Sequence, residues 1–154
     1  MVHWHSIGLG IMSGMRSMSA LAFVGNHINR YGPNRLKKTR FRWITGRTAS
    51  TLLTLMAATE LAADKSPFVP NRTDPAPLTG RIVTGALSAA IWNAYKKRPV
   101  WEGLIAGGVA AAFGTFAAFH LRRAAVQRLG IPDPAAAMAE DALVIGSGIG
   151  LLYE

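Results

Sequence analysis

Apolar residues gather in five stretches of the chain, separated by short segments that hold most of the charges. Each stretch is roughly 16 to 19 residues long, close to the ~20 residues that an α-helix needs to cross the hydrocarbon core of a bilayer. The pattern therefore predicts an all-α chain with about five helices of marginal membrane-spanning length. They are expected over about residues 6–24, 48–63, 79–95, 101–119 and 136–152.

The fourth stretch, WEGLIAGGVAAAFGTFAAFH, has little trace of a polar face at the helical period of 3.6 residues. A helix that is apolar all round lies either at the centre of a large protein or in a bilayer. A chain of 154 residues is too short to bury five such helices in one soluble core. We therefore expect one transmembrane domain over residues 1–154, a polytopic helical bundle, with a soluble helical bundle as the alternative.

Glycines recur at a spacing of four residues in three of the stretches. Small residues at this spacing let helix backbones approach closely where lipid gives no hydrophobic drive for association. The three pairs together favour a compact bundle. They are Gly10 with Gly14, Gly103 with Gly107, and Gly146 with Gly150.

The charges indicate an orientation in the membrane. The chain has 17 basic and 8 acidic residues, and the basic residues concentrate in the segments 30–47 and 96–98. We expect the chain in the cell (inner) membrane, with its basic loops on the cytoplasmic side. With an odd number of helices, this places the N-terminus outside and the C-terminus in the cytoplasm. The aromatic and basic run RYGPNRLKKTRFRW would suit nucleic acid in a soluble protein, but between two apolar spans it is better explained by anionic lipid headgroups.

Two pairs of segments can be aligned as an inverted repeat, an architecture common in small transporters. The segment 10–21, GIMSGMRSMSAL, aligns without a gap with 108–119, GVAAAFGTFAAF. In the same way MAATEL at 56–61 aligns with AMAEDA at 137–142. The similarity lies only in hydropathy and small residues, so chance is a serious alternative.

Arg16 is the most informative single residue, because it lies near the middle of an apolar stretch. A charge there costs at least ~2.5 kcal/mol on insertion scales and needs an interior partner or water. We expect an internal ion pair with Glu60, Glu140 or Asp141. For Glu60, which also needs a partner, Arg16 is the first candidate. The alternative is that the helix is shifted and that Arg16 extends to an interface.

Other charged residues border the apolar stretches. Glu60 and Asp64 are four residues apart, which places both on one face of a helix. Glu140 and Asp141 begin the fifth stretch, where acids also favour the dipole of a helix N-terminus. The candidate site for a buried charge or ligand consists of Arg16, Glu60, Asp64, Lys65, Arg81, Glu140 and Asp141.

Several kinds of chemistry lack support in the sequence. There is no cysteine, which excludes disulfides, thiolate metal sites and cysteine nucleophiles. His3 and His5 are spaced by two and cannot share one helical face as metal ligands. The run GSGIG lacks the central serine of a nucleophile elbow. We expect no metal, no cofactor and no enzymatic activity.

Four motifs together resemble a known family of bacterial membrane proteins, domain of unknown function 4126. They are SGMRSMSAL at 13–21, ELAADKSP at 60–67, PAPLTGRIVTGAL at 75–87 and AEDALVIG at 139–146. The resemblance implies a family pattern that includes Pro67 and Gly80 as well as the charged residues of the candidate site. The chain departs from that pattern in its long basic stretch 30–42 and in the serines around Arg16.

The leading functional hypothesis is a channel or transporter-like protein for a small ion or solute. In that role Arg16 and Arg81 would set charge selectivity or bind an anion, and the carboxylates would balance them or titrate with protons. The alternative is a structural or assembly subunit of a larger membrane complex. The expected partners are membrane lipids and either a second copy or such a complex, with no nucleic acid.

Overall fold

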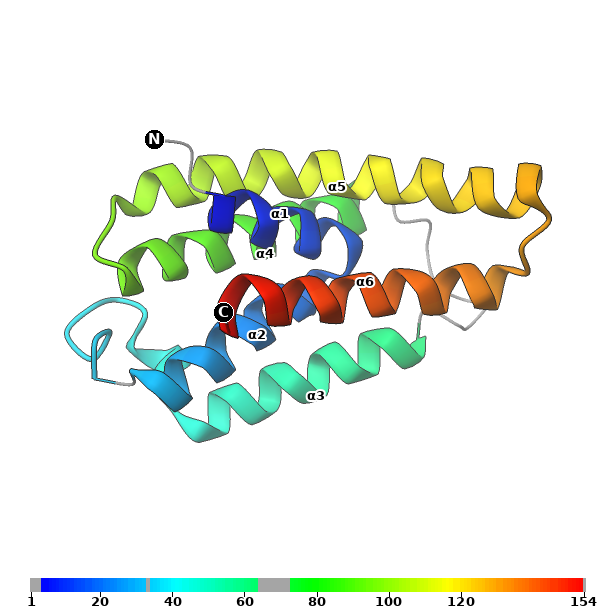
Figure 1. The fold of residues 1–154 in the computed structure, drawn as a ribbon. Coiled ribbons are helices and arrows are strands. Elements are labelled where there is room, and N and C mark those ends of the chain that lie inside the picture. Colours follow the sequence, from blue (N-terminus) through cyan, green and yellow to red (C-terminus); the bar gives the residue numbers. More distant parts are fainter. Residues whose placement is uncertain (1–3, 33, 64–72, 154) are drawn as a thin grey trace.

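A computed structural model describes residues 4–32, 34–63 and 73–153 of the chain. All regular secondary structure in these ranges is helical, which confirms the all-α prediction (Figure 1). The elements are α1 Trp4–Met15, α2 Ser17–Tyr31, the short 3-10 helix η1 Arg42–Thr45, α3 Arg47–Ala63, α4 Pro75–Tyr95, α5 Val100–Leu129 and α6 Asp133–Tyr153.

The prediction of one helix over residues 6–24 is wrong, because the chain breaks at Arg16. There the backbone is extended, with φ −141° and ψ 108°, and α2 runs back beside α1 instead of continuing it (Figure 1). Hydropathy cannot detect this reversal, since SGMRSMSA is as rich in small and apolar residues as a continuous helix would be. The first apolar stretch is therefore a helical hairpin.

The remaining predicted helices exist, with different bounds. The helix expected at 48–63 matches α3, whereas α4 begins at Pro75 instead of residue 79 because proline is favoured in the first helical turn. The helix expected at 101–119 continues to Leu129, through basic residues that are good helix formers. It ends at Gly130, whose φ of 65° is the left-handed conformation that glycine adopts without strain.

The helices form a bundle with two distinct ends. His5 near the start of α1 stacks on Trp92 near the end of α4, with 5.6 Å between ring centroids. His27 near the end of α2 lies 5.1 Å from the same indole and 5.3 Å from Tyr153 at the end of α6. We call this the aromatic end; the α5–α6 turn lies at the opposite end (Figure 1).

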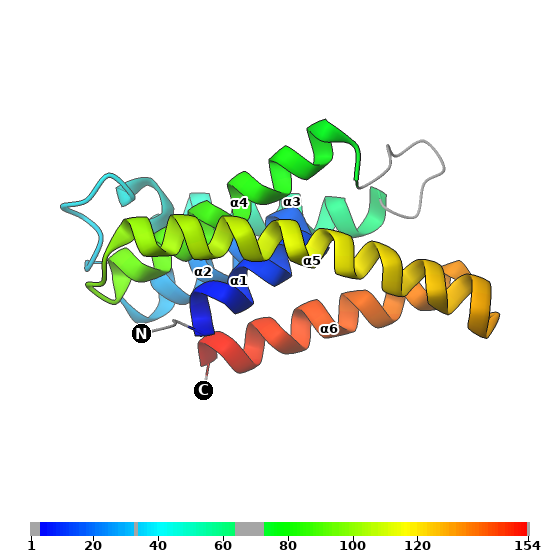
Figure 2. The same ribbon diagram turned by 90° about the horizontal axis from the view of Figure 1, so that it is seen from above.

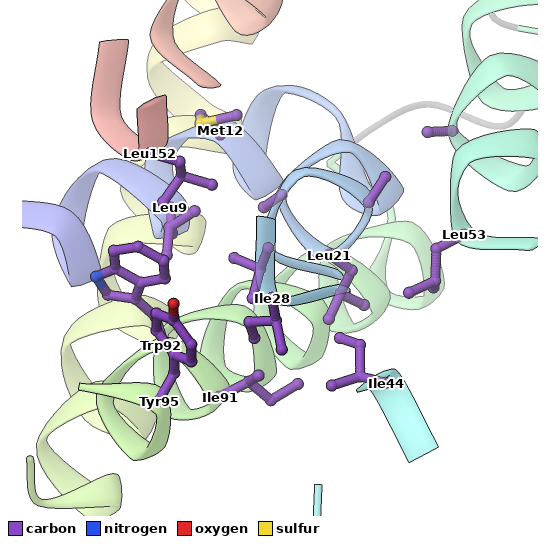
Figure 3. Packing of buried hydrophobic residues seen from close by; sticks show 14 of the residues in the cluster. Leu9, Met12, Leu21, Ile28, Ile44, Leu53, Ile91, Trp92, Tyr95 and Leu152 are labelled. Atoms are coloured by element: carbon purple, nitrogen blue, oxygen red, sulfur yellow. The ribbon is translucent and has the colours of Figure 1, made fainter. Parts of the chain in front are cut away.

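The core combines one apolar cluster with many buried polar groups. Leu9, Ile28, Ile91 and Trp92 meet where α1, α2 and α4 converge (Figure 3). The basic connection between α2 and α3 is attached to this cluster through Ile44, which is fully buried. The buried polar and charged residues are Ser6, Ser13, Arg16, Ser19, Ser50, Arg81, Thr84, Ser88, Asn93, Thr115 and Glu140.

Large apolar side chains cover much of the outer surface as well as the core. On α5, Val109 and Phe113 are 67% and 70% exposed, and α3 and α6 carry similar residues. Two helices, α5 and α6, are long and apolar enough to cross a membrane. The structure does not support the predicted bundle with five such spans.

The hairpin packs closely on α4 and α5 through glycine, while α3 packs on α2 and α6 lies beside α1 and α2 (Figure 1, Figure 2). A Cβ atom added to Gly10 would lie 2.5 Å from the carbonyl oxygen of Gly107 and 2.6 Å from Cβ of Ala110. Gly107 in turn meets the backbone of Gly85 on α4. Two of the predicted glycine pairs therefore lie at helix crossings, whereas Gly146 and Gly150 face open space.

The inverted repeat is not supported by the structure. The segment 10–21 contains the break at Arg16, whereas its proposed equivalent, 108–119, lies inside the continuous helix α5. A repeat would place corresponding backbones in the same conformation. The aligned residues share composition but not structure.

The contrast among the glycines yields a stability test. We expect Gly10→Ala to destabilise the fold by about 1–3 kcal/mol, because the added methyl group overlaps α5. Gly146→Ala has the same change and open space around it, so it should be neutral or stabilising by about 0.5–1 kcal/mol. Thermal unfolding of the two purified variants in detergent measures the difference. Equal melting temperatures would contradict the close packing.

Candidate functional site

The break at Arg16 exposes backbone polar groups inside the bundle. The end of α1 leaves carbonyl oxygens without helical partners, and the start of α2 leaves N–H groups without them. Arg16 itself is fully buried, with 0% of its surface exposed. Water cannot satisfy all these groups there, so side chains from other helices must do so.

Glu60 of α3 satisfies the start of α2. Its Oε1 accepts hydrogen bonds from the backbone N–H of Ser17 at 2.8 Å and from the Ser17 hydroxyl at 2.9 Å. Its Oε2 accepts one from the backbone N–H of Met18 at 2.9 Å. The carboxylate thus caps the positive end of a helix dipole from a different helix.

Arg81 of α4 satisfies the end of α1. Its Nη1 donates to the carbonyl oxygens of Gly14 and Met15, both at 2.7 Å, and the Thr115 hydroxyl adds a bond to Gly14 at 3.1 Å. A cation at the C-terminus of a helix is favoured by the dipole, as an anion is at the N-terminus. Arg81 Nη2 also lies 3.8 Å from Oε1 of Glu60, so the two capping charges balance each other.

The side chain of Arg16 forms an ion pair with Asp141 of α6. Nε donates to Oδ1 at 2.9 Å, and Nη2 lies 2.6 Å from the same oxygen. Asp141 was one of the three predicted partners. Arg16 was the first predicted partner of Glu60, but Glu60 instead caps α2 and lies near Arg81. The pair links the apex of the hairpin to the first turns of α6 across 125 positions of sequence.

A second charged group lies beside this pair, between α5 and α6. Arg122 binds Asp133 through two hydrogen bonds of 2.9 and 2.8 Å, and its Nη1 lies 3.8 Å from Oε2 of the buried Glu140. Arg122 and Glu140 also line a mostly apolar cavity of about 200 Å³ that Met15 borders from the hairpin. The charges around the break are thus next to space that a small molecule could occupy.

The structure brings together five of the seven residues of the predicted site: Arg16, Glu60, Arg81, Glu140 and Asp141. Asp64 and Lys65 lie outside the described residues. The sequence analysis did not single out Arg122 and Asp133. Arg122 lies in the part of α5 beyond residue 119, where the predicted helix ended.

The charged and polar side chains at the break come from several helices. Two arginines and two carboxylates lie at the break. Nearby, Ser13 Oγ of α1 lies 2.6 Å from Thr84 Oγ1 of α4. Within the described residues, no group of three or more metal-ligating side chains gathers to hold a metal ion.

Comparison with known proteins identifies the family. The family model described as Domain of unknown function (DUF4126) matches residues 4–151, so the chain belongs to this family and the predicted resemblance is confirmed. A search of curated proteins and of solved structures gave no significant match.

The ion pair at the hairpin apex yields a prediction. We expect Arg16→Gln to lower the free energy of unfolding by about 3 kcal/mol, because it leaves the Asp141 carboxylate largely buried without its cation. The charge-matched control is Arg128→Gln on the exposed end of α5, which should cost less than about 0.5 kcal/mol. Thermal unfolding in detergent provides the measurement. An Arg16→Gln variant as stable as the control would rule out a structural pair.

The cap on α2 yields a separate prediction. Glu60→Gln keeps the size of the side chain but replaces one accepting oxygen with an NH₂ group that cannot accept from an N–H. We expect a loss of about 1–3 kcal/mol, measured by thermal unfolding, and faster hydrogen exchange of the Ser17 and Met18 amides. Glu102→Gln, on the partly exposed first turn of α5, is the control and should leave exchange at these amides unchanged.

Proposed function

We propose that this member of the DUF4126 family is an integral membrane protein that passes or transports a small ion or solute at the break between α1 and α2. The observation that carries the proposal is the interrupted hairpin, whose two open helix ends are held by the charges of Glu60 and Arg81. Interrupted helices inside membrane proteins are characteristic of ion and substrate sites. Irregular backbone is tolerated at that depth only where protein buries it or where it lines a cavity.

Membrane embedding is supported by the distribution of polarity. Charged and hydroxyl side chains are buried, while leucine, isoleucine, valine and phenylalanine cover the outside of α3, α5 and α6. An apolar outer surface of this extent marks a membrane or an interaction site. The length and composition of α5 and α6 add to this argument.

The proposed topology differs from the one expected from the sequence. That expectation assumed that the first apolar stretch crosses once, but the hairpin brings Trp4 and Tyr31 to the same end of the bundle (Figure 1). The basic segments 34–47 and 96–98 and the end of α6 lie at that end as well. By the positive-inside rule, the proposal places this aromatic end in the cytoplasm, with both chain ends there.

In the proposed mechanism the capping charges are the functional groups. Arg81 and Arg16 are the groups that bind an anion, in competition with their carboxylate partners Glu60 and Asp141. Glu60 caps the N-terminus of α2, and an incoming anionic group could replace it there. Glu140 borders the cavity and is the carboxylate that a solute in the cavity would meet. No catalytic residue is part of the proposal.

A second candidate function is a structural subunit of a larger membrane complex. It is favoured by the fully buried guanidinium of Arg16, which is paired with Asp141 inside the protein as a lock between helices would be. Under this alternative the protein co-purifies with a partner in fixed stoichiometry and shows no flux by itself.

The hairpin makes a prediction about topology that cysteine labelling can test, because the chain has no cysteine of its own. Trp4→Cys, Lys38→Cys and Leu129→Cys all replace exposed residues. In oriented membrane vesicles an impermeant thiol reagent should modify the first two from one side and the third from the other. If positions 4 and 38 react from opposite sides, the first stretch crosses the membrane and the hairpin is refuted.

The transport proposal predicts flux through purified protein in liposomes. We expect flux of at least one small ion above that of protein-free liposomes. Arg81→Gln and the charge-neutral Ala136→Phe, which fills the cavity beside Glu140, should each reduce it at least about tenfold. Arg128→Gln is the charge-matched control. Absence of flux, or flux unchanged in both variants when they remain folded, would favour the structural role.

A further inference from the structure

A polar cavity opens at the aromatic end of the bundle, on the opposite side of the core from the helix break. Its volume is about 550 Å³, within the range of pockets that hold small molecules. Three helices build it where they meet: α2 near its end, α3 at its first residue and α6 at its end. The lining residues are Asn26, Asn29, Arg30, Arg47 and Tyr153.

The chemistry of the lining is that of an anion site. Two arginines, two asparagines and one tyrosine line the cavity, and none of the lining residues that the structure describes carries a carboxylate. Arginine is the residue that best matches a phosphate group, because its planar fork can donate two parallel hydrogen bonds. Arg47 also begins α3, so the positive end of that helix dipole adds to the same potential.

The wall of the cavity is held in place by its own contacts. Asn26 Nδ2 donates to Thr54 Oγ1 at 2.8 Å and to the carbonyl oxygen of Ala22 at 2.9 Å, and its Oδ1 accepts from Ser50 Oγ at 2.7 Å. The guanidinium of Arg30 lies 5.7 Å from the centre of the Tyr31 ring, a distance at which the ring attracts the cation. Two of the lining residues, Asn26 and Arg30, thus have partners within the protein before any ligand enters.

We propose that this cavity binds a phosphate group, with Arg30 and Arg47 as its two cationic ligands. The group could come from the headgroup of an anionic phospholipid or from a soluble phosphate compound, since both present the same oxygens. The cavity lies beside the basic segment 34–47, whose positive charges attract anions. The proposal does not depend on transport at the helix break.

The test compares two double variants that remove the same charge. Arg30→Gln with Arg47→Gln removes both cationic ligands, whereas Arg40→Gln with Arg42→Gln removes two exposed arginines of the same basic segment that do not line the cavity. Asn29→Leu is a third variant that alters the lining without changing charge. Thermal unfolding establishes that each variant is folded.

Binding is measured in two arms with detergent-purified protein. One arm titrates inorganic phosphate and glycerol 3-phosphate, and the other measures association with nanodiscs containing phosphatidylglycerol against phosphatidylcholine alone. We expect saturable binding in at least one arm. The affinity should fall about tenfold or more in the Arg30/Arg47 variant, and it should also fall in Asn29→Leu. It should not change in the control.

The arms identify the source of the phosphate. Binding of the soluble anions supports a soluble phosphate ligand, and binding confined to phosphatidylglycerol supports a lipid headgroup. No saturable binding in either arm would overturn the proposal. Equal weakening in the control variant would overturn it too, because it would show attraction by the basic segment as a whole and not by the cavity.

Discussion

The structure depends on one constraint: a chain that reverses direction inside a helical bundle must satisfy the backbone groups that the reversal exposes. At Arg16 the exposed groups have opposite polarity, N–H on α2 and C=O on α1. A carboxylate on α3 and a guanidinium on α4 provide the complementary charges. The positions of both helices relative to the hairpin are therefore set by electrostatics as well as by packing.

Close packing of the hairpin makes this capping geometry feasible. Arg81 reaches the end of α1 because glycines let α1, α4 and α5 approach until their backbones touch. Bulkier residues at those crossings would separate the helices and lengthen the hydrogen bonds to the break. The buried polar groups and the apolar outer surface are therefore compatible, because the helix contacts in this bundle use small residues and hydrogen bonds.

The two ends of the bundle present different chemistry. Around the break, arginines and carboxylates pair with each other inside the protein. At the aromatic end, His27, Trp92 and Tyr153 cluster, and the described residues that line the cavity beside them include two arginines and no acid. A protein with balanced buried charge at one end and excess positive charge at the other has a polarity that suits a fixed orientation in a membrane.

The sequence by itself determined the helical class, the family, the approximate position of α3 to α6 and most of the charged residues at the site. Hydropathy and spacing carry that information because they act locally along the chain. Only the tertiary structure decided that the first apolar stretch reverses at Arg16, that Arg16 pairs with Asp141, and that Glu60 caps α2. Those outcomes depend on which helices meet in space. A carboxylate that caps a distant helix has the same sequence signal as one that simply ends its own helix.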